Sequence, residues 1–330
     1  MDHGREVSLR NRRRDCTLRR LRCIYYSHRR FLFVSSYAGK YIPYIVDHIY
    51  RQDDSFNLQG FSINDPSIVN DHFGEEIPSY QFALEHQEEL KLNSTFVEEL
   101  KVKAKRLGVD KFIDEHLKFP PKGKIAPVKA LVNDKDGFWA PVYIAAKDAN
   151  PCFDIYQIHA QCPAPIDPLG FATGTQISSK ENFINDQPGF KSYVHAPTNA
   201  WVECTQKSVF SGRGADKSPY PADTGLLGSV IEKSKRSVIQ HGLLDYVLIA
   251  NGTLLGIQNT TWHGAQGFQN APKMPLVVDG KTAGIYHTER NLTFAYVADS
   301  GHMIPQDKPS VAFKLHQYLL GRIDETSLGK

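Results

Sequence analysis

The stretch VSSYAGKYIPYIVDHIY, Val34 to Tyr50, joins a predicted strand to a predicted helix. The apolar run Phe31–Val34, which leads into it, is typical of a short buried strand. Ser36 lies in the tight turn between strand and helix, so its hydroxyl is a candidate nucleophile. Beyond the turn, apolar residues recur at the spacing of one helical face, namely Ile42, Ile45, Val46, Ile49 and Tyr50.

The alternation of strands and helices returns towards the carboxyl end of the chain and indicates an α/β fold. Buried strands are predicted at Leu58–Ile63 and at KRSVIQHG, which ends at Gly242. A helix is predicted from Thr253 through Trp262. Later elements are strands at Pro275–Asp279, Gly284–Thr288 and Leu292–Ala298, and a closing helix at Pro309–Leu320.

The middle of the chain has a different character. Amphipathic stretches predict helices at 78–90, 94–107 and 110–117. A Pro/Gly/Asp-rich stretch from Phe119 to about Thr224 is predicted to be irregular. We therefore divide the chain into a basic arm (1–30), an α/β core (31–70 and 231–330) and a helical, loop-rich cap insertion (71–230).

Three polar residues follow predicted strands at the carboxyl ends, where open α/β sheets place their active residues. Ser36 follows FLFV, Asp245 follows SVIQHG, and His302 follows LTFAYVADSG. This is the order of α/β-hydrolases, in which the imidazole takes the serine proton and the carboxylate orients the imidazole. Each residue alone has a simpler interpretation: Ser36 as a helix cap, Asp245 as a turn or cap residue, and His302 as a surface or packing residue. The order of the three, each at a strand end, favours a catalytic triad. His241 is expected at the surface of a strand end rather than in this site.

Three motifs resemble those of the serine carboxypeptidase family, closest to its fungal members: SYAGKYIP, HGLLD followed by QNTTW, and GHMIPQDKP. The resemblance runs from about Ser36 to the C-terminus and implies an α/β-hydrolase sheet, incomplete in this chain, with a cap insertion. By the same resemblance Ser36 is the nucleophile, His302 the general base and acid, and Asp245 its orienting carboxylate. Met303 is then expected to line the pocket, and the Tyr37 N–H to donate to the oxyanion.

The resemblance also implies a reaction, the release of C-terminal residues from peptides through an acyl-enzyme, with no cofactor and no metal. The turn before the nucleophile departs from the family, because Val34 and Ser35 stand where relatives have Gly-Glu. The family's upstream half, with its second oxyanion donor and the implied partner of Cys204, is missing. We therefore expect a truncated chain with impaired activity, and a catalytically inactive remnant is the alternative.

Two features indicate a secreted or vacuolar origin. Cys152 and Cys162 flank a short polar-aromatic loop, where a disulfide suits an oxidising compartment and two buried free thiols are the alternative. Four Asn-x-Ser/Thr sequons predict glycosylation, at Asn93, Asn251, Asn259 and Asn291.

Residues 1–30 carry ten arginines and three acidic residues, a net charge of +7, whereas the remaining residues carry −4. Such a basic arm could bind nucleic acid or anionic lipid. No recognised binding module follows it, however, and we expect an unpacked or non-native segment. It has no apolar core typical of a signal peptide, and no run of eighteen apolar residues predicts a membrane span. The oligomeric state stays open.

Overall fold

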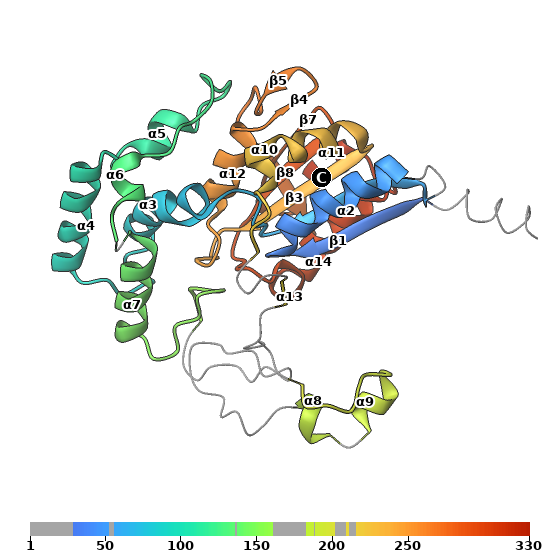
Figure 1. The fold of residues 1–330 in the computed structure, drawn as a ribbon, viewed down its shortest axis with the longest axis horizontal. Coiled ribbons are helices and arrows are strands. Elements are labelled where there is room, and N and C mark those ends of the chain that lie inside the picture. Colours follow the sequence, from blue (N-terminus) through green and yellow to red (C-terminus); the bar gives the residue numbers. More distant parts are fainter. Residues whose placement is uncertain are drawn as a thin grey trace, which may run out of the picture.

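The computed structural model describes residues 29–52, 56–135, 137–160, 183–187, 189–201, 209–210 and 216–330. Figure 1 shows a central sheet with helices on both faces and a group of helices extending to one side of it. The basic arm lies outside the described residues, apart from its last two positions. Within the described part, no helix is both long enough and apolar enough to cross a bilayer.

The central sheet has six strands in the order β1-β2-β3-β8-β7-β6. The first four strands are parallel, and β8, β7 and β6 are antiparallel to one another. Their bounds are β1 Arg30–Ser35, β2 Leu58–Asn64, β3 Arg236–Gly242, β6 Met274–Val278, β7 Lys281–Glu289 and β8 Leu292–Val297. A hairpin of β4 (Thr261–Trp262) and β5 (Ala265–Gln266) lies apart from this sheet. In the described sheet, β1 and β6 are the outer strands.

The carboxyl ends of the four parallel strands are in register. Ser35 of β1 pairs with Asn64 of β2, and Asn64 pairs with Gln240 of β3. Gly242, the last residue of β3, pairs with Val297, the last residue of β8. The three predicted site residues therefore all lie on the side of the sheet where the parallel strands end, each shortly after its own strand.

Helices cover the two faces of the sheet because successive strand residues point to opposite sides. On one face, Ile42 and Val46 of α2 (Ala38–Gln52) pack with Ile239 of β3 in the larger core cluster. On the other face, Leu315 of α14 (Pro309–Leu319) packs with Val238 of the same strand. The predicted apolar face of the first helix is thus correct for Ile42 and Val46, but Ile45 is 46% exposed.

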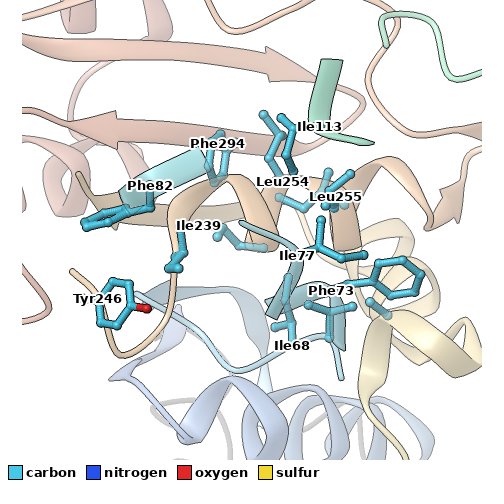
Figure 2. Packing of buried hydrophobic residues seen from close by; sticks show 14 of the residues in the cluster. Ile68, Phe73, Ile77, Phe82, Ile113, Ile239, Tyr246, Leu254, Leu255 and Phe294 are labelled. Atoms are coloured by element: carbon cyan, nitrogen blue, oxygen red, sulfur yellow. The ribbon is translucent and has the colours of Figure 1, made fainter. Parts of the chain in front are cut away.

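The larger core cluster continues from the sheet into the helices of the insertion (Figure 2). Phe294 of β8 and Leu254 of α12 lie in the same cluster as Phe73 and Ile77, which follow β2. The smaller helical elements of this region and of the C-terminus are α12 Ala250–Gln258, α13 Ile304–Asp307 and η3 Glu325–Gly329.

The described parts of the connection between β2 and β3 contain a series of helices separated by loops. This connection corresponds to the predicted insertion, which we retain as an interpretation of the domain organisation. A π-helix, η2 (His72–Glu76), leads directly into α3 (Ile77–Glu85). The remaining helices are α4 Ser94–Leu107, α5 Phe112–His116, α6 Lys129–Val132, α7 Trp139–Ala149, α8 Phe183–Asp186, α9 Phe190–Tyr193, α10 Pro221–Thr224 and α11 Leu226–Lys233.

Two of the predicted elements were wrong. The stretch after Phe119 is not irregular throughout, because α7 runs for 11 residues, and its apolar pattern is weak since only Val142 and Ala146 are buried. The helix predicted from Thr253 begins at Ala250 and ends at Gln258, before the β4–β5 hairpin.

Replacing Phe294 by alanine should lower the free energy of unfolding by about 3–5 kcal/mol, because the ring is fully buried and leaves a cavity. Phe313→Ala is the matched control, since that ring is 65% exposed and its loss should change stability by less than about 0.5 kcal/mol. Urea unfolding of both variants measures the difference, and equal losses would contradict the described packing.

Candidate active site

Ser36 occupies a strained turn at the end of β1. Its φ is +63°, a left-handed value that is uncommon for residues other than glycine and is often found at functional sites. The turn is held by backbone bonds, since Ser36 N donates to Asn64 O at 2.9 Å and Ser36 O accepts from Ser67 N at 3.1 Å and from Gly39 N at 2.8 Å. A Cβ on Gly39 would lie 2.6 Å from Pro66 Cβ, so α2 can begin this close to the next loop only with glycine there.

Asp245 and His302 form a buried, hydrogen-bonded pair. His302 Nδ1 lies 2.7 Å from Asp245 Oδ2, and the two side chains are 3% and 0% exposed. Asp245 Oδ1 accepts from the backbone N–H groups of Val247 at 2.8 Å and Leu248 at 3.3 Å. The carboxylate is therefore fixed by its own loop, and it fixes the orientation of the imidazole in turn.

The electrostatics of the pair favour its charged form. Burial lowers the pKa of His302, but the charge of Asp245 and the hydrogen bond outweigh burial, so the net pKa lies above its ordinary value. Burial raises the pKa of Asp245, but His302 and His241 outweigh it, so the net pKa lies below its ordinary value. An imidazole held in this way can accept a proton readily.

The loop after β8 carries His302 back across the sheet. His302 N donates to Tyr156 O at 2.7 Å, and the two rings lie 5.1 Å apart. Leu244 N, in the Asp245 turn, donates to Ser300 O at 2.8 Å. A Cβ on Gly242 would lie 2.1 Å from Gly301 O, so the two loops can approach this closely only with glycine at that position.

Two strands, β2 and β3, lie between β1, which precedes Ser36, and β8, which precedes His302. A carboxylate oxygen of Asp65, a carboxylate oxygen of Asp245 and a ring nitrogen of His302 lie within 4.8 Å of one another. Asp65 directly follows β2, which is the neighbour of β1. Within the described residues, however, the side chain of Ser36 forms no hydrogen bond with His302. The structure thus joins His302 and Asp245 directly and places Ser36 at the carboxyl end of β1, which β2 separates from β3.

His241 lies in the site, and its expected surface position was wrong. Its side chain is fully buried, and Nε2 lies 2.7 Å from Leu248 O and 3.6 Å from Asp245 Oδ2. Both faces of β3 are covered, so every residue from Ser237 to Gly242 is buried. Asp65 was missed altogether, although the rule that found Asp245 applies to it, because it follows a predicted strand.

An acidic group that sequence reasoning did not find lies near the site. Glu75 belongs to the π-helix η2, an element that is frequent at functional sites. Burial and the nearby charges of Asp71, Glu76 and Asp245 raise the pKa of Glu75 to about 8. No pattern in the sequence distinguishes this glutamate from its neighbours.

Tyr37 and Met303 flank the pair and the turn. Within the described part of the chain, the N–H of Tyr37 has no acceptor, which leaves it available to an oxyanion. The phenol of Tyr37 donates to Asp216 Oδ2 at 3.1 Å, and Lys40 forms an ion pair with the same carboxylate at 3.3 Å. Met303 is 38% exposed directly after His302.

The remaining predicted residues are cysteines and glycosylation sequons. Cys152 is buried and disulfide-bonded, whereas Cys162 and Cys204 lie outside the described residues. Asn93 and Asn291 are exposed, as glycosylation requires, and the Asn93 side chain also caps α4 by accepting from Phe96 N.

The other two sequons are less accessible. Asn251 is partly buried and its Oδ1 accepts from Tyr296 OH at 2.8 Å, while Asn259 binds both backbone groups of Ile125. Glycosylation stays a prediction, and the exposed Asn93 and Asn291 are its best-placed sites.

The profile described as serine carboxypeptidase matches residues 23–322. The chain belongs to the serine carboxypeptidase family. A probable serine carboxypeptidase of Arthroderma benhamiae is 37% identical over 313 residues, which cover 90% of this chain and 58% of that protein. Serine-type carboxypeptidase F of Aspergillus niger is 36% identical, over 88% of this chain and 60% of its own length. The chain thus spans about three fifths of the length of these relatives.

The fold agrees with the family. A prohormone-processing carboxypeptidase from Saccharomyces cerevisiae superposes with a TM-score of 0.62 at 20% identity, covering 91% of this chain and 64% of that one. This confirms the predicted α/β-hydrolase fold class. The expectation that the resemblance starts at Ser36 was wrong, because the family match begins at residue 23 and includes β1.

Replacing Gly242 by alanine should lower the free energy of unfolding by about 1–3 kcal/mol, because the new methyl group would overlap the Gly301 carbonyl. Gly74→Ala is the matched control, since a Cβ there would make only ordinary contacts at 3.5 Å. Urea unfolding compares the two, and a Gly242 variant as stable as the Gly74 variant would count against the close approach of the loops.

Glu75→Gln should alter the pH dependence of stability. The raised pKa means that folded Glu75 keeps a proton that the unfolded chain has lost, so wild-type stability falls by about 1.4 kcal/mol per pH unit between the two pKa values. The variant lacks this loss, so it should match wild type near pH 4, below both pKa values, and exceed it at pH 7.5. Urea unfolding at both pH values checks this, with the exposed Glu88→Gln as control; equal pH slopes for wild type and Glu75→Gln would contradict it.

Proposed function

We propose that this chain is a serine-type carboxypeptidase that releases C-terminal residues from peptides through an acyl-enzyme. The observation that carries the proposal is the buried His302–Asp245 pair, joined at 2.7 Å, in a chain of this family whose strained Ser36 turn follows a parallel strand of the same sheet. The names of its relatives, among them a carboxypeptidase Y homolog of Arthroderma benhamiae, support the substrate class.

In the proposed reaction, Ser36 Oγ attacks the carbonyl carbon of the last peptide bond while its proton passes to His302 Nε2. The N–H of Tyr37 donates to the developing oxyanion. The C–N bond then breaks, and His302 returns the proton to the leaving amino group. Water, deprotonated by His302, attacks the acyl carbon, and the released proton returns to Ser36 as the ester bond breaks. Asp245 stabilises the imidazolium in both halves without taking the proton.

The step that requires most adjustment is the first, because Ser36 and His302 are not hydrogen-bonded in the unliganded chain. Catalytic hydrogen bonds are often long in unliganded enzymes and tighten when substrate binds. Among the described residues, the Ser36 turn is held by backbone hydrogen bonds and the Ser36 hydroxyl forms none, so rotation of the side chain towards the imidazole breaks no hydrogen bond described in the structure.

Exposed apolar side chains neighbour the three proposed catalytic residues in the sequence. Tyr37, Leu243 and Met303 are 39%, 38% and 38% exposed, and they lie next to Ser36, near Asp245 and next to His302 in the sequence. Such a rim suits the side chains that flank a scissile bond. We further propose that the protein is secreted or vacuolar, that it is glycosylated at Asn93 or Asn291, and that Cys152 and Cys162 form a disulfide.

An active-serine phosphonate should label the purified chain at Ser36, and Ser36→Ala should abolish both labelling and release of a C-terminal residue from a blocked peptide. Removing the nucleophile of such a unit lowers kcat by roughly 10⁶-fold. Peptide mapping by mass spectrometry locates the label. Ser310→Ala, at an exposed position on α14, is the matched control and should label normally.

Two results would refute the proposal. Labelling at a residue other than Ser36 would show that the assigned nucleophile is wrong. A folded chain that neither reacts with the phosphonate nor releases any residue would instead favour a catalytically inactive member of the family. Val34 and Ser35, which end β1 where relatives have Gly-Glu, also suggest this alternative.

A further inference from the structure

A second buried aspartate lies behind the Asp245–His302 pair. Asp65 follows β2, is fully buried, and has a φ of +44°. Its Oδ1 accepts from Gly242 N at 2.7 Å, and its own N–H donates to Gln240 O at 2.8 Å. Asp65 therefore holds the end of β3, the point from which the Asp245 turn departs.

The two carboxyl groups lie close together and share a neighbour. Oxygens of Asp65 and Asp245 and a ring nitrogen of His302 lie within 4.8 Å of one another. His241 Nε2 lies 3.6 Å from Asp65 Oδ1 and 3.6 Å from Asp245 Oδ2. Two carboxylates buried this closely cannot both be ionised without a large energetic cost, so one of them retains a proton.

The hydrogen bonds decide which carboxyl carries the charge. Asp245 accepts from His302 and from two backbone N–H groups. Asp65 accepts only from Gly242, and within the described residues its Oδ2 has no hydrogen-bond partner. Because more donors stabilise the ionised form of Asp245, the proton belongs on Asp65. Burial and the charge of Asp245 accordingly raise the pKa of Asp65 well above its ordinary value.

We propose that Asp65 and Asp245 hold one negative charge between them, so that Asp65 is a neutral positioning residue that takes up the charge when Asp245 cannot carry it. The proposal deepens the proposed function, because it concerns the same imidazole, but it requires only a folded chain. A neutral Asp65 keeps His302 facing one anion rather than two, which limits the rise in the pKa of the general base.

Other charged groups face the site and are kept constant in the test. Asp307 Oδ2 accepts from Gly301 N at 2.7 Å and from Gln157 Nε2 at 3.0 Å. The charge of Asp154 raises the pKa of His302, and His241 lowers the pKa of Asp245. None of these residues is altered in the variants below.

The experiment is a titration of His302 by NMR on the full chain with isotope-labelled histidine, the resonance being assigned by its loss in His302→Gln. Wild-type His302 should titrate above its ordinary pKa of about 6.5. Asp65→Asn should leave this pKa unchanged, because asparagine is neutral and still accepts from Gly242 N. Asp245→Asn should keep it above 6.5, because Asp65 becomes charged. The double variant should lower it by about 1–3 units, because neither aspartate of the pair then places a charge beside the ring.

Asp279→Asn is the matched control, since Asp279 is exposed and has a similar φ of +51°. The proposal fails if Asp65→Asn alone lowers the pKa of His302 by 1 unit or more, because Asp65 would then be charged in the wild type. It also fails if Asp245→Asn alone lowers the pKa as far as the double variant. The latter comparison does not depend on how Asp65→Asn alone behaves. Loss of phosphonate labelling with an intact titration cycle would overturn only the proposed function.

Discussion

The hydrogen bond between His302 Nδ1 and Asp245 Oδ2 is the contact on which the rest of the site depends. It can form because the carboxyl ends of β3 and β8 are in register, with Gly242 opposite Val297. Backbone contacts then bring the two loops together, and glycine at position 242 leaves room for them. The imidazole is thus placed mainly by main-chain geometry, and Asp245 sets its orientation.

Burial acts on this site in two directions. For an isolated imidazole it opposes the charged form, and for a pair it strengthens the attraction between opposite charges. His302 and Asp245 gain more from their pairing than they lose by burial, as the directions of their pKa shifts indicate. For Asp65 and Glu75, burial and neighbouring carboxylates are the dominant influences, and they favour the protonated forms.

The sequence predicted the α/β fold and most strands closely, because buried strands are short apolar runs and each was followed by a turn. It also located Ser36, Asp245 and His302 at strand ends, a rule that depends only on topology. It could not place His241, because in a strand covered on both faces the alternation of polar and apolar residues carries no information. The environment of Glu75 and the contact of Asp65 with Gly242 arise from tertiary packing, which leaves no local pattern.

The strand that carries Ser36 is supported on one side only within the described sheet, since β1 pairs with β2 and has no second neighbour there. Outer strands have fewer cross-strand hydrogen bonds and are among the first segments to open in local unfolding. Asp245 and His302 leave interior strands, so they will stay together during such fluctuations while Ser36 moves. We therefore expect the distance from the Ser36 hydroxyl to the His302 imidazole to be the most variable distance of this site. A strand that paired with the outer side of β1 would restrict this distance before any other.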